Sequence, residues 1–137
     1  MKIERVTDLA APIEIRARVF IDEQGISRAD EIDGLDADCL HWLATDALGP
    51  VATLRVQPLG ATAKIQRVAV LRRARGTGIG AQLMRHVLED LADRKVARAV
   101  LGAQRDAIRF YEKLGFVAHG PEYDDAGIPH RDMILDL

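Results

Sequence analysis

Residues 72–80, Arg-Arg-Ala-Arg-Gly-Thr-Gly-Ile-Gly, are the part of the chain whose residue types and spacing are best suited to chemistry. They follow a β-like stretch, Lys64 to Val70, and lead directly into a helix-like pattern. Gly76, Gly78 and Gly80 let the backbone turn with φ > 0, so that successive amides can converge on an anion. The following helix adds its unpaired amides and the positive end of its dipole. The run therefore predicts a phosphate-binding turn.

The residues around this turn narrow the kind of phosphate that it binds. A nucleotide-hydrolysing P-loop needs a Lys-Ser/Thr pair after its last glycine, whereas Ala81 and Gln82 follow Gly80. A dinucleotide-binding fold has its glycine turn after the first strand and an acidic residue about 20 residues later. Here the turn lies midway along the chain, and Glu89 and Asp90 fall within the helix pattern. The pyrophosphate of coenzyme A remains a common ligand of such a turn, and an ordinary strand-to-helix corner would give the same glycines.

The composition is that of a globular protein with one domain. The 137 residues suit a single core, and 48% hydrophobic with 29% charged residues is ordinary. No apolar run approaches the ~18 residues of a membrane span, and the N-terminus is too polar for a signal peptide. Cys39 is the only cysteine, which favours the reducing cytoplasm. The net charge of −2 argues against nucleic acid as the main partner.

The charges are unevenly distributed. Seven acidic residues between Asp22 and Asp38 are opposed only by Arg28, whereas Arg72, Arg73 and Arg75 form a basic cluster. A chain that presents basic groups to a polyphosphate and acidic groups to a cationic amine would show this separation. Solvated loop charge is the alternative interpretation of the acidic stretch. Its members are Asp22, Glu23, Asp30, Glu31, Asp33, Asp36 and Asp38.

Alternating elements predict a three-layer α/β domain around a mixed, partly parallel sheet. We expect Asp8 to cap a first helix that buries Leu9, Ile13, Ala17 and Phe20. A helix after the glycine turn should bury Ile79, Leu83, Val87 and Leu91, and another should span Arg105 to Leu114. The predicted strands cover residues 2–6, 41–45, 50–57, 64–70, 97–101, 116–119 and 133–137.

Two motifs resemble those of the GNAT N-acetyltransferase superfamily. Residues 73–78, Arg-Ala-Arg-Gly-Thr-Gly, match its Arg/Gln-x-x-Gly-x-Gly/Ala signature, and residues 110–116, Phe-Tyr-Glu-Lys-Leu-Gly-Phe, resemble its later helix-to-strand motif. Residues 19–25, 31–34, 41–44 and 127–130 further resemble the small ElaA-like branch. Because the similarity covers nearly the whole chain, we expect residues 1–137 to form one N-acetyltransferase-like domain with a centrally splayed sheet.

The resemblance implies how the donor, acetyl-CoA, would bind. In the family two parallel strands part, and the pantetheine arm lies in the gap as a pseudo-strand. The strands here would be those ending at Val70 and Leu101, and the Val68 or Ala69 amide would polarise the thioester carbonyl. The donor-binding residues implied by the resemblance are Val68, Ala69, Val70, Arg73, Arg75, Gly76, Thr77, Gly78, Ile79, Gly80, Gln104 and Tyr111.

Tyr111, within the second motif, is the candidate general acid. Its phenol would protonate or hydrogen bond the departing thiolate, although a tyrosine packed in the core is the structural alternative. An alkylamine has a pKa near ~10, so a base must take its proton. Histidine is a common general base in enzymes, so His130 is one candidate for that base. Glu23, Glu31 and Glu122 are the others, and Glu23 and Glu31 would alternatively bind a substrate ammonium.

Two classes of function fit these residues. The first is an enzyme that moves an acetyl group from acetyl-CoA to a primary amine of a small molecule or peptide, in a ternary complex. The second is a catalytically inactive acyl-CoA-binding sensor or interaction module. No base or helix start activates Cys39 as an acetyl carrier, and the four histidines have no metal-ligand spacing, so we predict no metal. The resemblance also implies a homodimer through the C-terminal strands.

Overall fold

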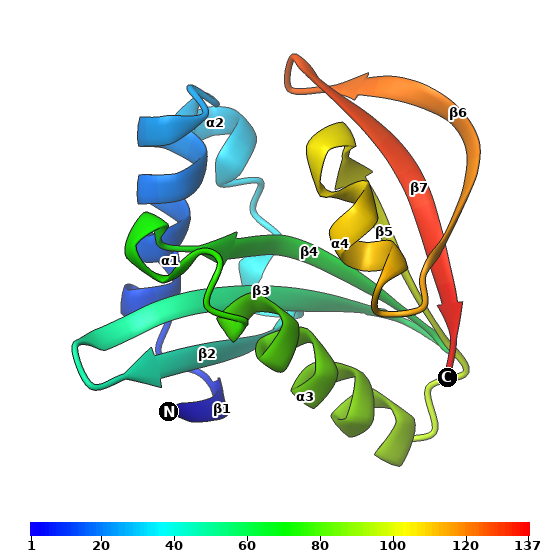
Figure 1. Cartoon of the computed structure of the whole chain (residues 1–137), viewed down its shortest axis with the longest axis horizontal. Coiled ribbons are helices and arrows are strands. Elements are labelled where there is room, and N and C mark those ends of the chain that lie inside the picture. The colour runs from blue at the N-terminus through cyan, green and yellow to red at the C-terminus, as the bar shows by residue number, and fades with distance from the viewer.

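The computed structural model describes all residues, Met1–Leu137, and contains one seven-stranded sheet. The strands lie in the order β1-β2-β3-β4-β5-β7-β6, and every neighbouring pair is antiparallel except β4 and β5 (Figure 1). Their bounds are β1 Lys2–Val6, β2 Leu40–Asp46, β3 Gly49–Leu59, β4 Thr62–Val70, β5 Arg98–Gln104, β6 Val117–Asp125 and β7 Ile128–Asp136.

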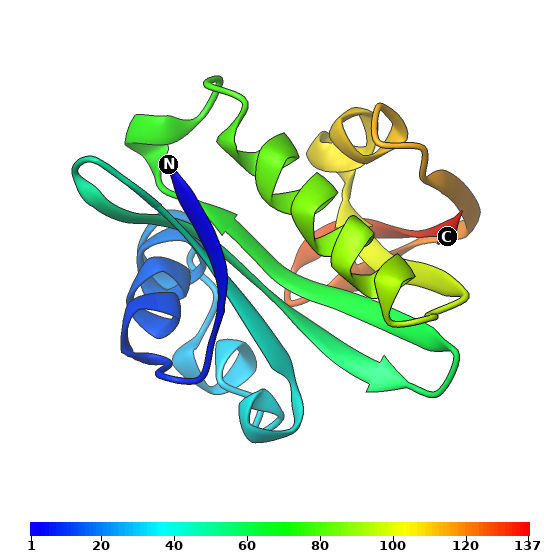
Figure 2. The same ribbon diagram turned by 90° about the horizontal axis from the view of Figure 1, so that it is seen from below.

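Helices cover both faces of this sheet, as Figure 2 shows. One face carries α1 with the π-helical turn η1 that continues it, and the other carries α3 and α4. The helices are α1 Ala10–Arg16, α2 Arg28–Glu31, α3 Ile79–Asp93 and α4 Ile108–Glu112, and the shorter helical turns are η1 Ala17–Glu23, η2 Asp36–Asp38, η3 Arg72–Ala74 and η4 Arg105–Ala107. The predicted three-layer α/β architecture is confirmed.

The parallel strands β4 and β5 pair over a short length only. Their register runs from Thr62 opposite Arg98 to Lys64 opposite Val100, and beyond that point they separate (Figure 1). The other edge of β4 stays paired with β3 as far as Val70 opposite Ala52. The sheet is therefore splayed at its centre, as the family resemblance predicts.

Each face of the sheet packs against its helices through an apolar cluster. On the α3 side Leu83, Val87 and Leu91 are buried, as their spacing predicts, and Met84 joins them. On the other side Ile15, Val19 and Phe20 pack against strand residues of β2 and β4. Burial of side chains from both faces fixes the sheet between two helical layers.

Two local predictions were wrong. Asp8 does accept a hydrogen bond from the Ala10 amide (3.0 Å), and Phe20 is buried as predicted, but Leu9, Ile13 and Ala17 are only partly buried. The other buried residues of this segment are Pro12, Ile15, Arg16 and Val19. The π-helical turn has more residues per turn than an α-helix, which shifts the phase of the buried face. The last two strands are each nine residues long. Both exceed the predicted strands 116–119 and 133–137, because β6 is almost entirely exposed and most of β7 is half-buried, so neither strand shows the alternation of buried and exposed residues that would predict its length.

Candidate active site

A cleft of about 340 Å³ opens where β4 and β5 separate. Both strands contribute to its walls, and it is completed by η1, α2, α4 and the β6–β7 hairpin. Because the backbone edges of the parted strands have no partner strand there, an extended ligand can add to them. The residues that line it include Gln24, Asp30, Glu31, Lys64, Arg67, Val68, Gly102, Gln104, Tyr111, Tyr123, Asp125 and His130.

Tyr111 lines this cleft from α4. Its ring is held edge-on by Phe110 and Phe116, at centroid distances of 5.1 and 5.9 Å. Burial raises the pKa of the Tyr111 phenol above its ordinary value, because the charged form would lose water. The phenol thus stays protonated at neutral pH and can donate a hydrogen bond into the cleft.

The glycine turn leads into α3 with its amides free. Gly76 and Gly78 have φ of +77° and +86°, which few residues but glycine adopt readily. None of the amides of residues 76–81 donates a hydrogen bond to another backbone group. Gly80 was predicted to help the turn, but it lies inside α3, where a Cβ would lie 3.3 Å from Val70 Cγ2. Gly80 therefore permits close packing of the helix on β4.

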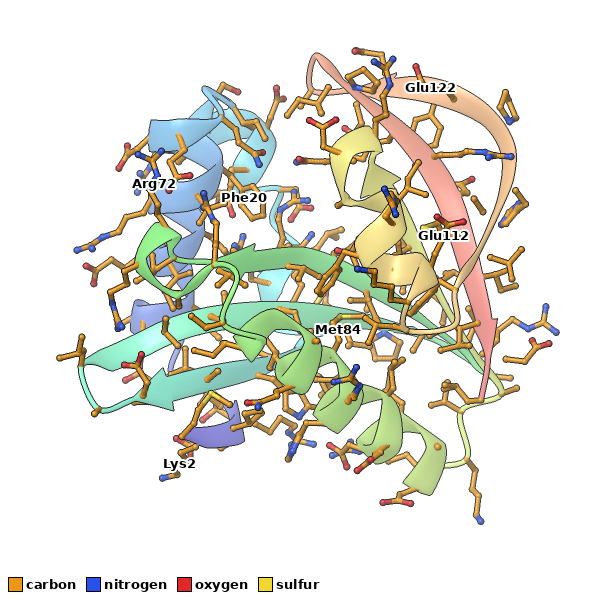
Figure 3. The ribbon with its side chains drawn as sticks, viewed as in Figure 1. Lys2, Phe20, Arg72, Met84, Glu112 and Glu122 are labelled. Carbon is orange, nitrogen blue, oxygen red and sulfur yellow. The ribbon has the colours of Figure 1, made fainter.

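The arginines of this loop already have partners. Arg73, predicted to bind the donor, forms a two-bond ion pair with Asp46 at 2.7 and 3.1 Å. Arg75 donates to the Val70 carbonyl (3.0 Å) and pairs with Glu23 (2.7 Å). Arg72, at the outer edge of the loop in Figure 3, lies 3.7 Å from the same carboxylate. Glu23 thus neutralises the basic loop, and it does not line the cleft.

Gln104, at the end of β5, bonds with Gln24, which follows η1. Their side-chain amides exchange two hydrogen bonds, of 2.8 and 3.2 Å. Both residues line the cleft. The two glutamines therefore bridge its opposite walls, and a ligand that uses the Gln104 amide must replace Gln24 as its partner.

His130, on β7, also faces the cleft and stacks on Tyr123 at a centroid distance of 5.9 Å. Its Nδ1 lies 2.7 Å from the Ile128 carbonyl oxygen. Because a carbonyl only accepts, Nδ1 carries the proton in this contact, and a neutral ring then has a free lone pair on Nε2. Tyr123 donates to Asp132 (2.8 Å), and burial together with this hydrogen bond raises its pKa to about 12.

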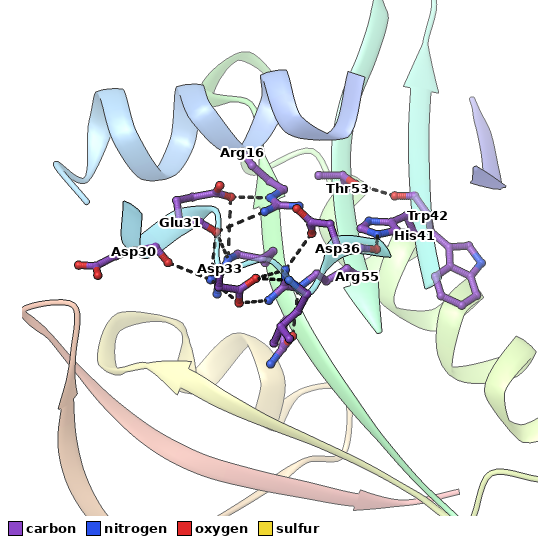
Figure 4. A network of polar contacts seen from close by, with 12 residues as sticks. Arg16, Asp30, Glu31, Asp33, Asp36, His41, Trp42, Thr53 and Arg55 are labelled. Carbon is purple, nitrogen blue, oxygen red and sulfur yellow. Dashed lines mark hydrogen bonds and ion pairs between the residues drawn. The ribbon is translucent and has the colours of Figure 1, made fainter. Parts of the chain in front are cut away.

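Much of the acidic stretch is neither solvated nor free to bind a cation (Figure 4). It folds over three arginines from α1, β3 and β4 and forms a set of ion pairs that we call the arginine network. In it Arg16 pairs with Glu31 at 2.5 Å and Arg55 with Asp33 at 2.6 Å. The members of the network are Arg16, Glu31, Asp33, Asp36, Arg55 and Arg67.

This network corrects the expectations for the acidic residues. The Glu31 side chain is only 2% exposed and bonded to Arg16, which leaves it poorly placed to accept a proton from a substrate. Glu122, on β6 in Figure 3, forms an ion pair with Arg105 outside the cleft, and that hydrogen bond lowers the pKa of its carboxyl. Two of the four proposed bases line the cleft, and of these the Glu31 carboxylate pairs with Arg16, whereas His130 Nε2 makes no hydrogen bond.

Sequence reasoning missed Arg67, Tyr123 and Gln24. Arg67 is an ordinary strand residue by pattern, yet it has φ of +56° at a register shift between β3 and β4 and lines the cleft. Tyr123 lies over Gly102, where a Cβ would overlap the phenol oxygen. No local sequence signal marks a bulge of this kind.

Two other properties bear on the site. No group of three or more His, Cys, Asp or Glu side chains is arranged to hold a metal ion. None of the helices has both the length and the apolar character to cross a bilayer.

A splayed α/β sheet with a glycine turn of free amides at one end and a buried phenol in the gap defines a GNAT-type acyltransferase domain. In agreement, the family described as "Acetyltransferase (GNAT) domain" matches residues 18–137, and the chain belongs to this family. The protein YyaT of Bacillus subtilis is 36% identical to this chain over 143 residues, covering 100% of this chain and 97% of its own.

ElaA of Escherichia coli places the chain in the ElaA-like branch. It is 30% identical over 137 residues, covering 96% of this chain and 90% of its own, and its crystal structure superposes with a TM-score of 0.86 over 97% of both chains. A GNAT family acetyltransferase from Elizabethkingia anophelis, solved with acetyl-CoA bound, shares the fold, with a TM-score of 0.76 and 19% identity over 99% of this chain and 97% of its own.

Proposed function

We propose that this protein transfers the acetyl group of acetyl-CoA to a primary amine by direct attack within a ternary complex. The observation that carries the proposal is the protonated Tyr111 phenol in the cleft between the parted strands β4 and β5. A domain that only bound acyl-CoA would need the cleft and the loop amides but no proton donor at its centre.

The donor would bind mainly through the backbone. The free amides of residues 76–81 and the start of α3 offer an anion site for the pyrophosphate. Acetyl-CoA bound to a protein of the same fold supports this ligand. Val68, Ala69 and Val70 would pair with the pantetheine arm along the open edge of β4, with Gln104 facing them from β5. The arginine pairs with Glu23 would exchange for pairs with phosphate.

The chemical step follows from the groups in the cleft. The amine nitrogen attacks the thioester carbon while the Val68 or Ala69 amide stabilises the charge on the carbonyl oxygen. As the carbon–sulfur bond breaks, Tyr111 donates its proton to the departing thiolate. His130 Nε2 accepts the proton that the attacking amine loses, either directly or through water.

A covalent acetyl-cysteine is not needed in this scheme. Burial raises the pKa of the Cys39 thiol, which lowers its fraction of reactive thiolate. Cys39 also lies outside the lining of the cleft. A cytoplasmic location and a homodimer through the C-terminal strands stay predictions, and β6 is an edge strand of the sheet, as such a dimer needs.

The release of free thiol from acetyl-CoA over a panel of amines tests the proposal. We expect turnover by the parent protein and a loss of about 10²-fold or more in kcat for Tyr111→Phe, because a general acid contributes at least that much. CoA affinity, measured by calorimetry, should be unchanged in the variant and serves as the control for folding. CoA binding without turnover on any amine would instead support the sensor or interaction module.

A further inference from the structure

Of the three arginines of the arginine network, Arg67 is the one that lines the cleft. Arg16 and Arg55 are 1% and 0% exposed and each makes close ion pairs, the shortest of 2.5 and 2.6 Å. The Arg67 side chain is 24% exposed, and every contact that it makes is 3.2 Å or longer. Two of the three arginines are thus saturated by carboxylates, and the third is not.

The contacts of Arg67 leave part of its guanidinium unused. Nε and Nη2 face the backbone carbonyls of Asp30 and Glu31 and the Asp33 carboxylate, whereas Nη1 makes no hydrogen bond. Asp33 and Glu31 are bonded more closely to Arg55 and Arg16. The Arg67 guanidinium therefore has two unused N–H donors on Nη1 at the wall of the cleft, and it shares its carboxylate partners with Arg16 and Arg55. An anion bound in the cleft can accept hydrogen bonds from these donors.

The backbone directs Arg67 to this position. With φ of +56°, it adopts the left-handed conformation that is disfavoured for residues other than glycine. The register between β3 and β4 shifts at the same point, between Thr53 and Arg55 on β3. A bulge re-aims a side chain, and strained backbone of this kind is concentrated at functional sites. The bulge thus presents Arg67 to the cleft beside Val68, one of the two residues whose amide is proposed to polarise the thioester.

We propose that Arg67 binds a carboxylate of the acceptor, so that the acceptor is an amine with a carboxylate close to its amino group, as in an amino acid. This inference rests on the proposed function, because the same cleft must hold the donor. An acceptor carboxylate bound to Arg67 would place the neighbouring amine near the thioester carbonyl that the Val68 or Ala69 amide would polarise. Asp30 and Asp125, which line the cleft without an ion-pair partner, would favour the ammonium form on entry and disfavour acceptors with several carboxylates.

Binding of matched compounds to the CoA-loaded protein tests this inference without requiring turnover. Each L-amino acid is compared with its own carboxamide by calorimetry, because the amide keeps the amine and removes the negative charge. We expect the parent to bind preferred amino acids about 10- to 100-fold more tightly than their amides, the range for a hydrogen bond to a charged group. Arg67→Gln should reduce this ratio to near one.

Two variants control for charge and folding. Lys64→Gln removes the same charge from the cleft where β4 and β5 are still paired, and it should keep the preference for carboxylates. Arg67→Lys keeps the charge without the planar guanidinium and should retain part of the ratio. CoA affinity and the melting temperature of each variant show whether it is folded.

The outcomes separate this inference from the proposed function. A ratio near one in the parent, or a ratio that survives Arg67→Gln, overturns the inference even if acetyl transfer to amines occurs. Loss of the ratio in Lys64→Gln but not in Arg67→Gln would assign the carboxylate to the other end of the cleft. Carboxylate-specific binding without any acetyl transfer would keep Arg67 as an anion site and overturn the proposed enzyme.

Discussion

From the arginine network we predict how much the substitution of Arg16 lowers the free energy of unfolding. This side chain is 1% exposed and bonds Glu31 at 2.5 Å and Asp36 at 2.7 Å. Arg16→Met keeps the volume and the helix propensity, but it leaves the Glu31 carboxylate buried with only Arg67, at 3.8 Å, as a counter-ion. Asp36 keeps its 2.8 Å pair with Arg55. Arg16→Met therefore leaves one buried charge, the Glu31 carboxylate, without a close partner.

Breaking a buried ion pair by removing one partner costs about 3–5 kcal/mol. Because Arg67 remains near Glu31, we expect the low end, about 3 kcal/mol. That loss corresponds to a fall of roughly 10 °C in Tm for a domain of this size and a shift of about 1 M or more in the urea midpoint. Urea unfolding followed by circular dichroism at pH 7 measures it.

The chain supplies a matched control two residues further on. Arg18 pairs with Glu14 on the surface, with side chains 59% and 65% exposed, and the same change to Met should cost less than about 0.5 kcal/mol. The double variant Arg16→Met with Glu31→Leu should recover most of the loss, because no unpaired charge then remains at this position. Equal costs for Arg16→Met and Arg18→Met, or a double variant no more stable than the single one, would refute the reasoning.

Two further predictions concern pH and the hairpin. A hydrogen bond from Arg55 lowers the pKa of Asp33. Burial raises the pKa of Asp36, but hydrogen bonds from Arg16 and Arg55 lower it overall. The stability that these two carboxylates contribute is therefore present above the pKa of an unfolded aspartate, near ~3.9, and is lost as the pH falls further. The urea midpoint should drop below about pH 4, and less steeply in Asp33→Asn. Gly102→Ala, whose methyl group would overlap the hydroxyl at the end of the partly exposed Tyr123 side chain, should displace that side chain at a cost of about 1 kcal/mol or less. Tyr123→Phe in the same chain should relieve part of that cost, as thermal unfolding would show.

The glycine turn and the buried face of α3 were predictable from sequence because they are built from local signals. A glycine turn and a helix start are encoded within a few residues, and so is the spacing that buries Leu83, Val87 and Leu91. The arginine network was not predictable from such local signals. Arg16 and Glu31 are 15 residues apart in sequence, and Arg67 and Glu31 are 36 apart. Seen as a sequence, the acidic stretch has one arginine, whereas its actual partners come from α1, β3 and β4.

The glycine turn and the arginine network differ in how far they depend on particular side chains. The proposed donor site consists of backbone amides, whose hydrogen bonding depends little on side-chain identity. The cleft wall that includes Asp30 and Glu31 depends on where residues 22–38 lie, and ion pairs with Arg16, Arg55 and Arg67 hold that segment over the sheet. Arg67 is thus both a support of this wall and part of its surface. A substitution of Arg67 would therefore change the shape and the charge of this wall together.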